Sequence, residues 1–160
     1  DMDVKLVFPE VVIPVCSPSY LREAGGPLDP AQLARQRLLH FDDGYYHWFD
    51  WRSILAEFGV ESGGTPAGPT FNSFIVLVQA ALKGEGIALG WRYMMDDYLA
   101  SNALVPAADI CMRSERGYFC LTQKERPASQ SATAFVEWIA ARGRSAMAEE
   151  RVIAPASFVR

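Results

Sequence analysis

The residues best suited to bind a small molecule lie in the segment Thr70-Phe71-Asn72-Ser73. Asn and Ser side chains accept hydrogen bonds from the first N–H groups of a helix, and an apolar helical pattern follows over 73–83. The first turn of a helix also presents unpaired N–H groups and a partial positive charge, which attract anionic or polar groups. We therefore expect Asn72 to cap this helix and the turn to face a ligand.

A dense aromatic group offers a second kind of binding chemistry, through Tyr45, Tyr46, Trp48 and Trp51. Trp48 and Trp51 share one face of a helix expected over 47–58, which favours a core position for both. Tyr45 and Tyr46 precede that helix and are freer to face a ligand. Aromatic rings attract quaternary ammonium groups, so Tyr46 is a candidate contact for such a ligand.

Phe41 and Asp42 are further candidates, because they end a strand expected over 37–41. Side chains at a strand end can point into the same site as a neighbouring helix N-terminus. Asp42-Asp43-Gly44 is also typical of a turn, so a purely structural role for Asp42 stays open.

Catalytic and metal chemistry find little support in the residue pattern. His40 and His47 are the only histidines, and no clustered ligands of suitable spacing accompany them. Ser73 has no adjacent base and orienting group of the kind a hydrolase needs. Gly84-x-Gly86 lacks the third glycine of a dinucleotide loop and predicts a tight turn instead. We expect no enzyme activity, no metal and no cofactor.

Strand and helix patterns alternate along the chain. Strands are expected over 5–8, 11–16, 37–41, 70–71, 87–89, 104–105 and 118–122. Short helices open at Ser17-Pro18 and Asp29-Pro30, and others are expected over 47–58, 73–83, 94–100 and 130–141, the last with Ala132, Phe135, Val136 and Ile139 inward. The alternation indicates an α/β fold with largely parallel strand pairing.

Composition indicates a globular domain. Half of the 160 residues are apolar, 21% are charged and the net charge is −4. The Lys and Arg residues are scattered singly, so we expect this segment itself not to bind nucleic acid. No run is apolar enough to span a bilayer, and no secretory signal opens the chain. Three widely spaced cysteines favour buried, reduced thiols and a cytoplasmic location, with no membrane partner: Cys16, Cys111 and Cys120.

The order of these elements resembles the effector-binding domain of LysR-type transcription regulators. Residues 11–21 resemble the strand that crosses into the second lobe of that family, and 71–90 resemble its helix, Gly-x-Gly turn and returning strand. Segments 104–106, 118–121 and 135–139 match the closing elements of the first lobe. Trp91, after Ala-Leu-Gly, suggests the branch of the glycine-cleavage activator, and within it regulators of choline sulfate utilisation.

The resemblance implies the fold of type 2 periplasmic binding proteins, with two lobes around a ligand cleft. It implies that 1–10 is a crossing strand from lobe one, 11–90 is the effector-binding lobe two, 91–145 is the C-terminal part of lobe one and 146–160 is a tail. It places the segment 70–73 at the cleft. Trp91 then lies at the second crossing, where it either lines the cleft or packs the hinge.

The chain departs from the family pattern in lacking the N-terminal DNA-binding domain, the linker helix and much of lobe one. Lobe one is therefore expected to be incomplete, with exposed apolar faces at 118–122 and 135–139, and to associate with another copy or pack loosely. The resemblance implies as partners a small choline-like or carboxylate effector, a second copy in a homodimer or tetramer, DNA through the missing domain, and RNA polymerase indirectly. A solute-binding protein of a transporter is the alternative.

Overall fold

The computed structural model describes residues 1–42, 44, 49–60, 66–124, 128–153 and 158–159, with side chains described as far as residue 145. The chain forms two compact units. The smaller contains Asp1–Val11 and Arg113–Ala154, and the larger contains Val12–Met112 and Pro155–Arg160. Residues 91–112 thus group with the larger unit, and the functional division into lobes stays a prediction.

The sheet of the larger unit mixes parallel and antiparallel strands. β2 (Leu38–Phe41) runs parallel to both β3 (Thr70–Phe71) and β4 (Ile87–Trp91). β1 (Met2–Cys16) is antiparallel to β4 and to β5 (Val105–Pro106). The expectation of largely parallel pairing is therefore right around β2 and wrong around β1. Alternation of strands with helices does not fix the direction of the first strand.

The described residues of the larger unit form five helices, and a side-chain cap marks the start of only the first three. The five helices are α1 (Pro18–Glu23), α2 (Pro30–Leu33), α3 (Trp51–Glu57), α4 (Phe74–Leu82) and α5 (Arg92–Ala100). Ser17 caps α1 and Asp29 caps α2, each followed by Pro, as the sequence predicts.

The expected start of α3 at residue 47 is wrong. Asp50 caps this helix by accepting a hydrogen bond from Ser53 N at 2.6 Å, so that the helix begins at Trp51. Tyr45, Tyr46, His47 and Trp48 lie outside the described residues.

A continuous apolar core holds the larger unit together. Trp51 is 1% exposed and donates its indole N–H to the Leu39 carbonyl oxygen at 2.9 Å. The members with no exposed surface come from helices, strands and the loops between them: Val12, Cys16, Leu33, Leu38, Ile54, Leu55, Ile87 and Ala107. Burial of this many large side chains supplies the main stabilisation of the unit.

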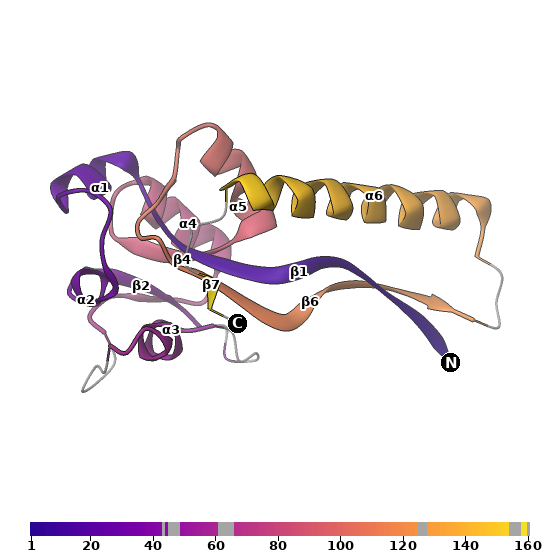
Figure 1. Cartoon of the computed structure of the whole chain (residues 1–160), viewed down its shortest axis with the longest axis horizontal. Helices are drawn as coiled ribbons and strands as arrows, with labels where there is room; N and C mark the ends of the chain where they lie inside the picture. Colours follow the sequence, from indigo (N-terminus) through magenta and orange to yellow (C-terminus); the bar gives the residue numbers. More distant parts are fainter. Residues whose placement is uncertain (43, 45–48, 61–65, 125–127, 154–157, 160) are drawn as a thin grey trace. The chain divides into compact units, whose positions relative to one another are not determined.

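The smaller unit is built from the first half of β1, from β6 (Cys111–Gln123) and from α6 (Gln130–Ile153) (Figure 1). Contacts of Phe8 with Tyr118 and of Asp1 with Lys124 show that β1 and β6 run antiparallel here. The two strands expected over 5–8 and 11–16 form one strand, which continues through Pro9. Proline is tolerated in an edge strand, because the missing N–H has no neighbour to bond.

Helix α6 covers only part of this ribbon. Ala140 and Gly143 are buried on its inner side, and Val136 and Ile139 are partly buried, as expected. Ala132 and Phe135, which the helical pattern places inward, are exposed, so that part of the prediction is wrong. The helix also runs past residue 141 to Ile153. The helix approaches β1 closely at Gly143, where a Cβ would clash with the Val7 carbonyl oxygen.

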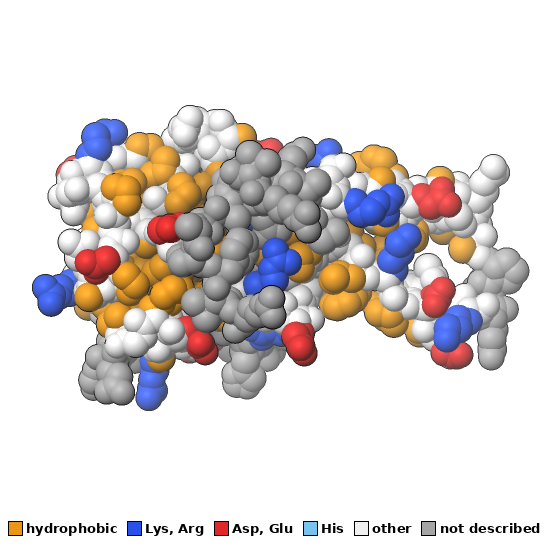
Figure 2. All heavy atoms as spheres, viewed as in Figure 1, with side chains coloured by type: hydrophobic (Ala, Val, Ile, Leu, Met, Phe, Trp, Pro, Cys, Tyr) orange, Lys and Arg blue, Asp and Glu red, His pale blue; other side chains and the backbone are white. Residues whose placement is uncertain are grey.

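The smaller unit exposes many large apolar side chains, including those of 118–122 and 135–139 that were expected to be exposed. They are Met2, Val4, Leu6, Tyr118, Phe119, Leu121, Phe135 and Trp138. Figure 2 shows hydrophobic side chains at the surface along β1 and β6. Strand β7 (Phe158–Val159) pairs in parallel with β6 only at Cys111 and Met112, in the larger unit. None of the described helices is both long and apolar enough to cross a bilayer.

Candidate functional site

Three neighbouring strands of the larger unit end at the same edge of the sheet. His40 pairs with Thr70 and Phe41 with Phe71 in the parallel ladder of β2 and β3. β4 is parallel to β2 on its other side, in register from Leu38 and Ile87. In open α/β sheets, ligands bind outside the carboxyl ends of parallel strands. Phe41, Asp42, Asn72 and Ser73 all lie at this carboxyl edge, and Trp91 is the last residue of β4.

A cluster of three aromatic rings lies at this carboxyl edge of the sheet. The ring of Phe74 lies 5.4 Å from that of Trp91 and 5.7 Å from that of Phe41, in edge-to-face geometry. Phe41 and Trp91 are 6.4 Å apart, so the three rings contact one another pairwise. The sequence predicts Phe74 only as part of the apolar face of the helix expected over 73–83, so this contact was missed. The signal that could have found it is its position directly after the turn 70–73.

The turn before α4 does not cap the helix in the expected way. Ser73, not Asn72, occupies the N-cap position, and no side chain accepts a cap hydrogen bond there. Asn72 is exposed and sits in the bend that leads out of β3. The prediction that Asn72 caps this helix is therefore wrong, because β3 extends to Phe71 and the bend uses Asn72. The first-turn N–H groups of α4 keep their capacity to bind a polar group.

Asp42 is held at the edge by local hydrogen bonds. Its backbone N–H donates to the Phe71 carbonyl oxygen at 2.9 Å, and its carboxylate accepts from Gly44 N at 2.8 Å. The carboxylate therefore makes the expected turn while its side chain stays exposed. Thr70 is exposed and Phe71 half-buried next to it, whereas Tyr46 lies outside the described residues.

A small cavity lies under the carboxyl edge. Phe41 and Trp91 line it together with Leu39, His40, Phe49, Asp50, Trp51, Leu77 and Leu89. Its volume of about 20 Å³ has room for about one water molecule. His40 shares a hydrogen bond of 2.9 Å with the Pro66 carbonyl oxygen. This bond ties the strand end to the loop after α3.

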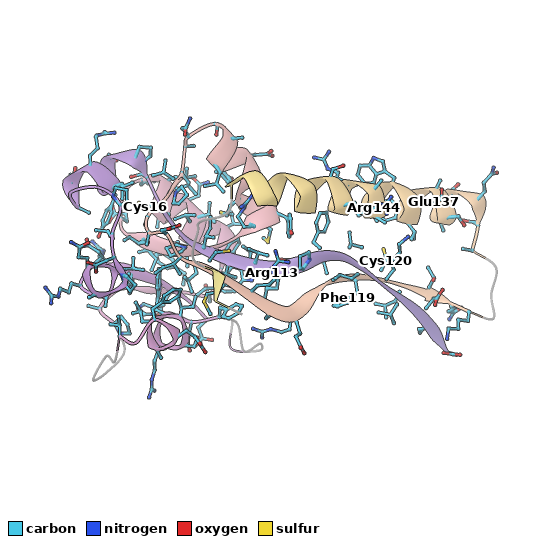
Figure 3. The ribbon with its side chains drawn as sticks, viewed as in Figure 1. Cys16, Arg113, Phe119, Cys120, Glu137 and Arg144 are labelled. Carbon is cyan, nitrogen blue, oxygen red and sulfur yellow. The ribbon has the colours of Figure 1, made fainter. Side chains whose placement is uncertain are left out.

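The described residues hold no cluster of three or more His, Cys, Asp or Glu side chains suited to a metal ion. Cys16 and Cys111 are buried, as expected, whereas Cys120 is only partly buried. Figure 3 labels Cys16 at the end of β1 and Cys120 on β6. Burial raises the pKa of the Cys16 thiol to about 11, which leaves it a poor nucleophile near neutral pH.

Comparison with known proteins places the chain in a family. The family described as "LysR substrate binding domain" matches residues 1–144. The chain belongs to the LysR substrate-binding domain family. Its mixed α/β fold is that of LysR effector domains, which confirms the expected fold class: the effector domain of AmpR from Pseudomonas aeruginosa aligns with a TM-score of 0.71 at 20% identity, over 94% of this chain and 69% of that one.

Curated relatives of this LysR domain are named as transcription regulators. The glycine cleavage system transcriptional activator of Escherichia coli strain K12 is 27% identical over 139 residues, which cover 87% of this chain and 44% of that protein. The HTH-type regulator y4mQ of Sinorhizobium fredii is 31% identical over 135 residues, 81% of this chain and 42% of that protein. The chain thus spans less than half the length of these relatives.

Proposed function

We propose that this LysR domain senses a small polar metabolite and relays its binding to a DNA-binding domain of the same protein. Family membership and the names of the relatives support a regulator over a solute-binding protein or an enzyme. In the whole protein, DNA is the partner of that other domain, RNA polymerase is reached indirectly, and the regulator acts in the cytoplasm as a homodimer or tetramer. An effector acts in such a system only by binding one arrangement better than another.

The observation that carries this proposal is the meeting of three strand ends and one helix N-terminus at one edge. Asn72 and Ser73 offer polar groups there, and α4 offers first-turn N–H groups, which suit a carboxylate or a sulfate. The proposed effector site comprises Phe41, Asp42, Thr70, Phe71, Asn72, Ser73 and Trp91, with Tyr46 as a further candidate.

We infer that the effector carries a quaternary ammonium group, as choline and choline sulfate do. The partly exposed rings of Phe41 and Phe74 support this, because aromatic faces attract such cations. Trp91, which contacts both rings, is only 5% exposed. The exposed carboxylate of Asp42 adds a negative charge nearby. A small carboxylate without a cation is the competing effector, favoured by the helix N-terminus alone.

A thermal-shift screen tests both inferences. Choline, choline sulfate, glycine betaine, glycine and simple carboxylates are added to the protein, since a ligand at a hundredfold excess over its dissociation constant stabilises the folded state by about 2.7 kcal/mol. We expect a selective shift that is reduced in Asn72→Ala and in Asp42→Asn. Asp97→Asn is the matched control, because Asp97 is an exposed carboxylate on α5.

The possible results separate the two levels of the proposal. If only glycine or carboxylates raise the melting temperature, the inference of a quaternary ammonium group is wrong. The proposed site is still supported, provided that Asn72→Ala reduces the shift. A shift that neither site variant changes would place the effector elsewhere. If none of these compounds raises the melting temperature, the proposed effectors are wrong.

A further inference from the structure

A groove between α4 and α5 lies within the larger unit, beside the carboxyl edge of the sheet. Its volume is about 170 Å³, against about 20 Å³ for the cavity under that edge. An apolar protein cavity of about 150 Å³ can hold a benzene molecule, so the groove has room for one aromatic ring. The lining consists of Phe74, Ile75, Val78, Gln79, Met94, Met95 and Tyr98.

The groove has a buried side and a mouth that is open to water. Val78 and Met95 are 5% and 2% exposed, whereas Ile75 and Met94 are 74% and 49% exposed. A ligand can therefore enter from solvent without any opening of the fold. Thioether side chains such as that of Met95 are flexible and polarisable, and they pack favourably on aromatic rings. An aromatic ring that fills the groove thus gains both burial and contacts with sulfur.

The charge of the groove differs from that of the carboxyl edge. None of its seven lining residues carries a charge. A charged ligand would lose water on entry and gain no opposite charge, so the groove favours a neutral molecule. The carboxyl edge, by contrast, offers the exposed Asp42 carboxylate and the first-turn N–H groups of α4. The two places therefore select ligands by opposite criteria.

Two polar groups of the lining are free to bind a ligand. They are the side-chain amide of Gln79 and the hydroxyl of Tyr98. Within the part of the chain that the structure describes, neither side chain makes a hydrogen bond. Each can donate and accept, so a ligand with one hydroxyl group pairs with either of them.

We propose that the α4–α5 groove, defined by these seven lining residues, binds a small neutral molecule with one aromatic ring and one hydroxyl group. Phe74 belongs both to the groove and to the ring cluster with Phe41 and Trp91. The occupant therefore lies against a ring that also borders the proposed effector site. The proposal does not depend on that site, because it uses none of the polar groups at the carboxyl edge.

Benzyl alcohol, benzoate and benzylamine test the groove, since they share one ring and differ in charge. NMR of isotope-labelled methionine methyl groups reports where each compound binds, because an aromatic ring shifts the signals of methyl groups beside it. Benzyl alcohol is expected to shift the signals of Met94 and Met95, assigned by substitution with Leu, and to leave those of Met2 and Met112 in place. The two charged compounds are expected to bind about tenfold more weakly, or worse.

Ile75→Glu and Val76→Glu form a matched pair of variants, since both replace an exposed apolar side chain of α4 and only Ile75 lines the groove. Ile75→Glu is expected to weaken the binding of benzyl alcohol about fivefold or more, and Val76→Glu by less than about twofold. Gln79→Ala combined with Tyr98→Phe removes both hydrogen-bonding groups and is expected to weaken it about fivefold. Circular dichroism checks that every variant is folded.

Four results would overturn the proposal. One is that benzyl alcohol leaves the signals of Met94 and Met95 unmoved at its highest soluble concentration, and another is equal binding of the three compounds. A third is an equal effect of Ile75→Glu and Val76→Glu. The fourth is a response that Asn72→Ala abolishes, which would place the ring at the carboxyl edge and support the proposed effector site instead.

Discussion

The two units of this chain use the same residue types to opposite effect. Trp51 of the larger unit is 1% exposed, and Trp138 of the smaller unit is 57% exposed. Both lie on helices and both have apolar helical neighbours in the sequence. The difference lies in what each helix packs against: α3 covers a sheet closed by other helices and loops, whereas α6 lies on two strands. An apolar helical pattern thus marks a face that can be buried, while the rest of the fold decides whether it is.

The clearest way to test this comparison is to remove each tryptophan side chain. Trp51→Ala leaves a large cavity and removes the hydrogen bond to the Leu39 carbonyl oxygen, so we expect a loss of about 3–5 kcal/mol in the free energy of unfolding. Trp138→Ala is expected to change it by less than about 0.5 kcal/mol. Urea denaturation followed by circular dichroism gives both values. Equal losses would mean that the smaller unit buries Trp138 in solution.

A second test concerns a close contact between α6 and β1. A Cβ at Gly143 would clash with the backbone of Val7. In an open helix, Gly→Ala stabilises by about 1 kcal/mol, so the sign of the effect reports on packing. We expect Gly143→Ala to destabilise the protein by about 1–3 kcal/mol. Ser145→Ala, at an exposed position of the same helix, is the control. Stabilisation by Gly143→Ala would show that α6 is not packed on β1 in solution.

The features of the fold that could be predicted from the sequence are those with local causes, whereas those that depend on distant parts of the chain could not. The starts of α1 and α2 were predictable, because Ser17 and Asp29 act on N–H groups three residues away. The start of α3 was not, because Asp50 competes with an apolar pattern that extends before it. The continuity of β1 through Pro9 depends on an edge that only the assembled sheet creates.

The candidate site divides in the same way. The turn 70–73 was predicted as a ligand-facing segment from its residue types, and that role stays a prediction. The contacts of Phe74 with Phe41 and Trp91 could not be predicted, because they depend on the order of β2, β4 and α4 in space. Local patterns identify which residues can bind, whereas strand order decides which of them meet.

A third test uses pH to examine a buried thiol of the larger unit. Because burial raises the pKa of Cys16 from 9.0 to about 11, the folded state keeps a proton that the unfolded state loses between these values. Stability from this group is thus full below about pH 9 and falls by up to about 1.4 kcal/mol per pH unit above it. We expect the stability difference between the parent and Cys16→Ala to shift by about 1 kcal/mol from pH 9 to pH 10. A difference between parent and Cys16→Ala that does not change with pH would contradict the raised pKa of Cys16.

The smallest expected effect is a change in the pKa of Tyr118, which depends on the carboxylate of Glu10 in the smaller unit. The buried Glu10 carboxylate accepts hydrogen bonds from Ser114 at 2.6 Å and from Arg116 at 2.9 Å. Burial, and secondarily the charge of Glu10, raise the pKa of Tyr118 above 10.0. Glu10→Gln removes only the second cause, so the pKa of Tyr118 should fall but stay above its ordinary value.

Alkaline absorbance titration measures this pKa, with Tyr118→Phe identifying the signal and Glu115→Gln as the control on an exposed carboxylate of β6. If the pKa of Tyr118 is unchanged in Glu10→Gln, Glu10 and Tyr118 are far apart in solution. The pairing of β1 with β6 would then not extend to these two residues. A fall limited to Glu10→Gln would show the opposite. The ribbon would then be ordered around a buried carboxylate and its partners, in a unit whose apolar side chains largely remain exposed.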